Sequence, residues 1–120
     1  MYAIPKTIQQ CDRLISVAPL KTHSMTGIVG GSWGVEADGP HAPGARSVHH
    51  NVVIAGANAL SVDGVDAAVM GFKAADLPYL AMAERRGFGV ADADAIWTRG
   101  NDIQEAHHLF QKPARWRKKA

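Results

Sequence analysis

Short apolar runs alternate along the chain with polar and glycine-rich stretches, and this pattern predicts its secondary structure. Two runs, 13–20 and 50–58, are largely apolar and contain β-branched residues. Runs of this kind are typical of strands that are buried on both faces. Between them, residues 27–48 hold six glycines and two prolines, which predicts mostly loop. A proline that opens the stretch 5–10 favours a short helical turn there.

Two helices are predicted after the second apolar run. The first extends from Ser61, a suitable N-cap, to Gly71, a suitable C-terminal stop. Its apolar residues recur at the spacing of one helical face, at Val62, Val65, Val69 and Phe72. The second follows Asp76 as N-cap, presents Leu77, Leu80 and Ala81 on its apolar side, and has Arg85 and Arg86 in a last turn before Gly87.

The remaining elements complete an α/β pattern. We expect a short strand at 95–98 and a last helical turn within 102–109. Because strands alternate with helices, the predicted fold is a small layered α/β domain, in which helices flank a mixed or parallel sheet. Its 120 residues, 47% of them hydrophobic, suit one domain at 1–111, and residues 112–120 form a basic C-terminal tail.

The net charge of +2 comes from the tail, because five of the thirteen basic residues lie in the last nine positions. Residues 1–111 hold eight basic and eleven acidic residues and carry a charge of −3. The tail could contact nucleic acid, but we favour a solvated terminus and expect no nucleic-acid partner. No signal-like or membrane-spanning apolar stretch is evident, so we expect a cytoplasmic protein with no membrane contact.

The first candidate for chemistry is the stretch "PLKTHSMTG", residues 19–27. A strand that ends at Lys21, Thr22 and His23 and turns at Ser24, Thr26 and Gly27 offers positive charge, hydroxyls and free backbone N–H groups to an anion. Within it, Lys21 and His23 are the candidate catalytic residues, since the imidazole titrates near neutral pH and can carry a proton. The other interpretation, a solvated strand end followed by a polar turn, stays open.

The second candidate is the acidic loop 35–44. Glu36, Asp38 and His41 stand close together there, and hard oxygen ligands with one imidazole suit a divalent metal such as Mg²⁺ or Mn²⁺. Gly39 would shape the loop for ligand binding. Asp63, at the start of the first long helix, could join either site or simply favour the positive end of that helix. On composition alone, we favour a solvated acidic turn for this loop over a metal site.

The paired histidines and the single cysteine give weaker evidence for a functional site. Neighbouring histidines point in different directions on a strand or a helix, so neither His49 with His50 nor His107 with His108 should chelate a metal through both rings. Cys11 is the only cysteine, which excludes an intrachain disulfide and a cysteine-ligated iron–sulfur cluster within this chain. No nucleophile elbow, phosphate-binding loop, zinc-protease motif or dinucleotide fingerprint is found.

Four blocks together resemble a known family. The stretches "LISVAPLKTHSMTG", "GVEADGPHAPG", "VVIAGANALSVDGVDAAVMGF" and "LPYLAMAERRGFG" are similar to the ordered blocks of the domain of unknown function 362 family, which is often joined to iron–sulfur modules. The resemblance covers about residues 5–113. It implies that the family's motif positions fall at Lys21, Thr22, His23, Glu36, Asp38, Gly39, Pro40, Gly56 and Asp63.

The chain departs from the family pattern between its first two blocks. The Lys-Thr-His turn runs almost directly into the acidic loop, and Gly30 stands where the family would have an aspartate. The family's upstream region and its cysteine-rich module are also missing from these residues. A shortened member would expose apolar surface, which favours self-association, so we expect a homodimer or another homo-oligomer.

Two functions follow from these residues. The first is a small enzyme-like domain that binds an anionic ligand and a divalent metal, with redox-linked chemistry and a separate iron–sulfur partner implied by the resemblance. The second is a non-catalytic homo-oligomeric interaction module, or a remnant of a larger family member. The sequence does not decide whether the chain is an enzyme.

Overall fold

The computed structural model describes residues 5–13, 21–23, 27–29, 33–39 and 41–114, with the backbone alone for 21–23, 27–29 and 33. The predicted strand at 13–20 therefore lies almost wholly outside the described residues. The elements are α1 (Lys6–Gln10), β1 (Lys21–His23), β2 (Gly27–Val29), β3 (Trp33–Glu36), β4 (Arg46–His49), α2 (Ala59–Val69), α3 (Pro78–Arg85) and α4 (Ile103–Ala106), with 3-10 turns at Ala74–Asp76 and Ala93–Ala95.

The strands form one small sheet in the order β2-β1-β3-β4. β1 pairs with β2 and β3 with β4 in antiparallel fashion, whereas β1 and β3 run parallel, with Lys21 opposite Val35. The combination of helices with a sheet confirms a mixed α/β content, although β1–β4 all precede α2 and α3 and do not alternate with them. The prediction of mostly loop at 27–48 is wrong, because three strands lie there. Pairing between strands outweighs the low strand propensity of glycine at Gly27 and Gly34.

The prediction of a strand at 50–58 is also wrong. Residues 50–57 are in no helix or strand. Asn51 has a φ of 52°, a left-handed conformation that asparagine tolerates but a strand does not permit. This bend ends β4 and directs the following chain away from the sheet, so the β-branched run has no neighbouring strand.

The predicted helix after Ser61 is confirmed as α2, although it begins three residues earlier, at Ala59. Asn58, not Ser61, is the N-cap, and its side-chain oxygen accepts the Ser61 N–H at 3.0 Å. The Ser61 hydroxyl instead donates to the Val90 carbonyl at 2.9 Å. Gly71 follows the helix with a φ of 80°, the left-handed conformation that commonly ends a helix.

The later elements agree less closely with the sequence pattern. Asp76, predicted to cap the next helix, lies in a 3-10 turn, and α3 begins at Pro78, because proline suits a first helical turn. The predicted strand at 95–98 is wrong, since a 3-10 turn ends at Ala95 and the residues after it pair with no strand. The predicted last helical turn is confirmed as α4, with Asp102 as N-cap.

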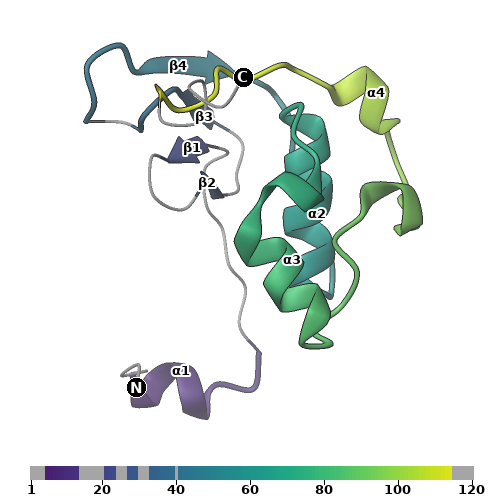
Figure 1. Cartoon of the computed structure of the whole chain (residues 1–120). Helices are drawn as coiled ribbons and strands as arrows, with labels where there is room; N and C mark the ends of the chain where they lie inside the picture. Colours follow the sequence, from purple (N-terminus) through teal and green to yellow (C-terminus); the bar gives the residue numbers. More distant parts are fainter. Residues whose placement is uncertain (1–4, 14–20, 24–26, 30–32, 40, 115–120) are drawn as a thin grey trace.

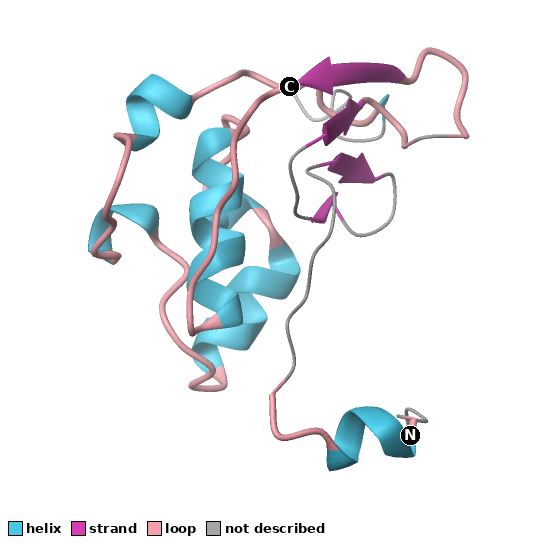
Figure 2. Ribbon diagram, turned by 180° about the vertical axis from the view of Figure 1, so that it is seen from behind, coloured by secondary structure: helices cyan, strands magenta, loops and turns pink. Residues whose placement is uncertain are grey.

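The core lies between α2, α3 and the C-terminal segment 107–114. Its buried side chains are Leu60, Ala67, Met70, Phe72, Leu77, Leu80, Ala91 and Phe110. In both ribbon views α2 and α3 lie side by side, with the sheet near one end of the pair and the exposed α1 set apart from the rest (Figures 1 and 2). No helix in the described ranges is long and apolar enough to cross a membrane.

The segment 107–114 connects the helices to the sheet. The His108 and Phe110 N–H groups donate to the carbonyls of Val69 and Met70 at 2.8 and 3.1 Å, which satisfies two acceptors that the end of α2 leaves without helical partners. A few residues further on, the Ala37 N–H at the end of β3 donates to the Gln111 carbonyl at 3.1 Å. One short stretch of backbone therefore joins both halves of the fold.

Gly64 allows α2 to approach the segment that follows α3. A Cβ atom added at Gly64 would lie 2.2 Å from the Ala91 carbonyl oxygen, which is far inside van der Waals contact. Ala91 itself is buried, and its N–H donates to the Glu84 carboxylate at 3.0 Å. The backbone at Ala91 therefore has little room to move away.

We predict that Gly64→Ala destabilises the protein by about 1–3 kcal/mol despite the better helix propensity of alanine, which offers only about 1 kcal/mol. Chemical denaturation followed by circular dichroism measures the change. Gly44→Ala is the matched control, because nothing lies within 4 Å of its added Cβ and only its φ of 83° opposes it; its expected cost is about 1 kcal/mol. Equal or greater stability of Gly64→Ala would contradict the close approach.

Candidate functional site

The sheet brings the two candidate blocks of the sequence together at the level of the backbone. Lys21, Thr22 and His23 form β1, and Gly27 opens β2 opposite His23. Because Lys21 lies opposite Val35 of β3, the strand that carries the basic block runs beside the strand that ends at Glu36. Ser24, Thr26 and Pro40 lie outside the described residues.

Glu36 is buried, with 3% of its surface exposed, and its carboxylate is already engaged. The Arg46 guanidinium of β4 forms an ion pair with it, and the Arg46 Nε–H donates to its Oε1 at 2.8 Å. Its Oε2 accepts the Gln111 N–H at 2.8 Å. Burial by itself raises the pKa of Glu36, but the Gln111 N–H and Arg46 outweigh burial, so the pKa is lowered.

Asp38, two residues after Glu36 in the turn that follows β3, has a similar role. Its Oδ1 accepts the Ala114 N–H at 3.0 Å, so two acidic side chains hold the segment 111–114 against the end of β3. His41 is exposed, and Gly39 is buried in the turn with a φ of 103°. Across the described ranges, no three histidine, cysteine or acidic residues lie together as a metal site would require. The metal site stays a prediction.

Asp63 lies in a different part of the fold from these residues. It is on α2, one turn before Asp66, and both carboxylates act electrostatically on Tyr79 of α3. Asp66 is only 5% exposed. Burial and the charge of Asp63 raise the pKa of Asp66 to about 7, and burial raises that of Asp63. The two carboxyl groups also raise the pKa of Tyr79, after burial.

The described part of the chain has a groove that the sequence pattern did not reveal. It has a volume of about 1000 Å³. One wall is the extended segment 49–58, the floor is the face of α2 that carries Ser61, Val62, Val65 and Val69, and the other wall is the segment 96–108. We call it the α2 groove.

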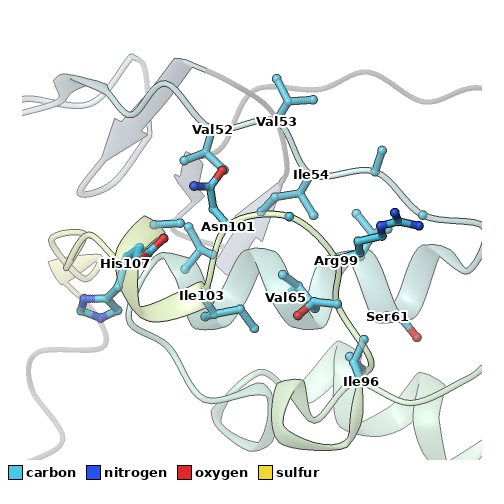
Figure 3. Close-up of a pocket in the computed structure, with 18 of the residues that line it drawn as sticks. Val52, Val53, Ile54, Ser61, Val65, Ile96, Arg99, Asn101, Ile103 and His107 are labelled. Atoms are coloured by element: carbon cyan, nitrogen blue, oxygen red, sulfur yellow. The ribbon is translucent and has the colours of Figure 1, made fainter.

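The extended wall of the α2 groove presents alternating faces. Val52 and Ile54 are half-buried and point toward α2 and the opposite wall, whereas Val53 points away from them and is 85% exposed (Figure 3). Between Asn51 and Ala57, no backbone hydrogen bond is formed with any described residue. The wall therefore has the side-chain alternation of a strand without a neighbouring strand.

One member of each histidine pair meets at the end of the groove. The rings of His50 and His108 lie 5.5 Å apart between centroids, and each lies 5.5 Å from the Phe110 ring. His50 Nε2 lies 2.7 Å from the Ala106 carbonyl, which assigns the ring proton to Nε2 because a carbonyl only accepts. The buried Nδ1 of His50 has no hydrogen-bond partner in the described chain.

Comparison with known proteins identifies no relative. No protein-family model matches the chain, and no curated protein or solved structure is significantly similar to it. The resemblance to the domain of unknown function 362 family stays a prediction.

We predict that Glu36→Ala destabilises the fold by about 2–3 kcal/mol, because it leaves the half-buried Gln111 N–H without this acceptor and removes the partner of Arg46. Glu36→Gln retains an acceptor oxygen and should cost about half as much. The control, Glu105→Ala, changes an exposed glutamate and should stay within about 0.5 kcal/mol. Urea denaturation measures all three. Similar stabilities for the two Glu36 variants and the control would show that the carboxylate does not hold the C-terminal segment.

We predict that stability falls as the pH rises from about 4 to about 7, because the folded protein keeps a proton on Asp66 that the unfolded chain releases at its lower pKa. Asp66→Asn removes this loss and should be more stable than the wild type by roughly 3 kcal/mol at pH 8. Asp63→Asn should shift the pH midpoint downward, since it removes the neighbouring charge. Thermal unfolding across this pH range would contradict the burial of Asp66 if wild type and Asp66→Asn change in parallel.

Proposed function

We propose that the chain is a non-catalytic interaction module that binds an extended apolar protein segment in the α2 groove by strand addition. The observation that carries this proposal is the segment 51–57, which has β-branched side chains and no backbone partner among the described residues. An added strand would take hydrogen bonds from alternate residues of this segment.

The chemistry of the groove supports a protein strand as the ligand. Its floor is made by valine side chains of α2, and Val52 and Ile54 extend this apolar surface along the wall. On the opposite wall, Trp97 is 84% exposed. Large exposed aromatic side chains are frequent anchors in protein interfaces, since they bury much surface at little entropic cost. Polar side chains such as Asn101 and Arg99 also line the groove.

Binding of a strand would also complete the predicted architecture. With a partner beside 51–57, this segment would become part of a sheet that packs on α2, and the domain would have the layered α/β arrangement expected from its sequence. Burial of Val53 and of the backbone is what the β-branched composition of 51–57 favours. We therefore expect the segment to be an ordered strand only in the complex.

The second candidate function is the binding of an anionic ligand and a divalent metal near β1 and the acidic loop. The adjacency of β1 and β3 favours it. Against it, the carboxylates of Glu36 and Asp38 already accept the backbone N–H groups of Gln111 and Ala114. An enzymatic role for Lys21 and His23, a redox-linked reaction with an iron–sulfur partner and a cytoplasmic location all stay predictions.

The metal prediction has a direct test. Mn²⁺ is titrated into the wild type and into Asp38→Ala while the melting temperature is followed. A metal site would raise the melting temperature of the wild type with a saturable dependence on Mn²⁺, and Asp38→Ala would lose this rise. Coincident curves for the two proteins would exclude a site that uses Asp38.

Strand addition predicts a change in hydrogen exchange at 51–57. The probe is a capped seven-residue peptide of alternating valine and threonine, with a lysine at each end for solubility. When it is added to dilute ¹⁵N-labelled protein, alternate amides of 51–57 should exchange at least tenfold more slowly, because each gains an acceptor.

Two variants make this test specific. Val53→Asp places a charge in the segment and should abolish the protection, whereas Phe88→Asp changes a residue that is 65% exposed and does not line the groove, and should retain it. Unchanged exchange at 51–57 with millimolar peptide, or equal protection in both variants, would refute the proposed function.

A further inference from the structure

We infer that the strand that occupies the α2 groove is residues 51–57 of a second copy of this chain, paired antiparallel across a twofold axis. This inference rests on the proposed function and names its partner. The dimer would contain two copies of the same segment side by side, each of which supplies the ladder that the other lacks.

The exposed surface of the chain supports a partner of this size. The whole chain exposes 8888 Å², whereas a compact monomer of 12.8 kDa is expected to expose about 6300 Å². Its radius of gyration is 14.7 Å, against about 13.6 Å for a compact domain of this length. The exposed α1 accounts for part of the difference of roughly 2600 Å². Val53 and Trp97, which are 85% and 84% exposed, both line the α2 groove, so part of the exposed apolar surface lies there. A standard interface needs about 800 Å² from each partner.

The charge pattern favours self-pairing over pairing with a charged strand. No lysine, arginine, aspartate or glutamate occurs between Arg46 and Asp63. When a strand pairs with a second copy of itself across a twofold axis, a charged residue near the axis lies close to the same residue of the other copy. The two like charges repel each other and destabilise the pair. The segment 51–57 avoids this cost, and its neutral apolar side chains match those of its own copy.

The alternation of the segment also restricts the register. Residues that lie directly opposite one another in an antiparallel pair share a face of the sheet. Val53 of each copy must therefore lie opposite another exposed residue, and the half-buried Val52 and Ile54 must lie opposite one another. A twofold axis at Val53 satisfies both conditions, because it pairs Val53 with Val53 and Val52 with Ile54 of the second copy. The ladder is then centred on 52–54, and Asn51, with its left-handed φ, ends it as it ends β4. A shift by one residue would turn the half-buried side chains of one copy to the exposed face of the other.

The first experiment measures the mass of the full chain by sedimentation equilibrium between about 1 and 500 μM, with reductant present because Cys11 is exposed. We expect a concentration-dependent change from 12.8 kDa to twice that mass. Val53→Asp should weaken dimerisation at least tenfold, since it places two carboxylates opposite each other. The control Phe88→Asp should dimerise like the wild type. Both positions are exposed, so neither substitution is expected to unfold the monomer.

The second experiment tests the register. In a Cys11→Ser background, Val53→Cys should form an interchain disulfide under mild oxidation, because opposite residues of an antiparallel pair bring their Cβ atoms to about 4.5–5.5 Å. The control is Phe88→Cys in the same background, which should give little cross-linked product. Non-reducing electrophoresis measures the yield.

The outcomes separate this inference from the proposed function. A dimer that Val53→Asp weakens and Val53→Cys cross-links supports the inference. A monomer at every concentration, or a dimer that neither Val53 variant affects, overturns it. If that monomer still gains protection at 51–57 with the valine-threonine peptide, the proposed function stands with another partner, and if it gains none, both are wrong.

Discussion

The fold depends on the segment 107–114, which satisfies backbone groups of the helices and of the sheet in succession. Its N–H groups cap the end of α2 through Val69 and Met70, and those of Gln111 and Ala114 bind the carboxylates of Glu36 and Asp38. Phe110 lies between these contacts in the helical core. Since the sheet and the helices share few other described contacts, this crossing determines how they sit relative to one another.

The same arrangement leaves the segment 51–57 without a partner. Asn51 bends the chain away from β4, and the segment 107–114 crosses to the sheet without pairing with the β-branched run. The result is a strand-like wall beside α2 whose backbone is open to solvent. Water can form hydrogen bonds with the backbone groups of 51–57 in the monomer. The exposed apolar side chains, however, contribute hydrophobic free energy only when another chain covers them. The interaction function that we propose follows from the lack of a backbone partner at 51–57 among the described residues.

How far the sequence predicts this structure depends on whether the determining contacts are local. The helix α2 follows from its apolar spacing and from Gly71, which act within a few residues. The run 50–58 predicts a buried strand only if a neighbour is present, and nothing local reveals that Asn51 removes it. Glu36 and Asp38 stand out in the sequence as candidate metal ligands, a prediction that stays open, whereas their backbone partners lie 75 and 76 residues away and no local pattern indicates them. The α2 groove was missed, although a β-branched run without a second strand pattern near it could have indicated an open edge.

We propose that residues 51–57 become an ordered strand when they pair with a second copy of themselves. The most direct measurement is an isotope-filtered NOE experiment on an equal mixture of ¹³C,¹⁵N-labelled and unlabelled chains at high concentration. The account predicts intermolecular contacts between the Val53 protons of the two chains and between Val52 and Ile54 of opposite chains. Intermolecular contacts that arise elsewhere while 51–57 shows none would contradict it.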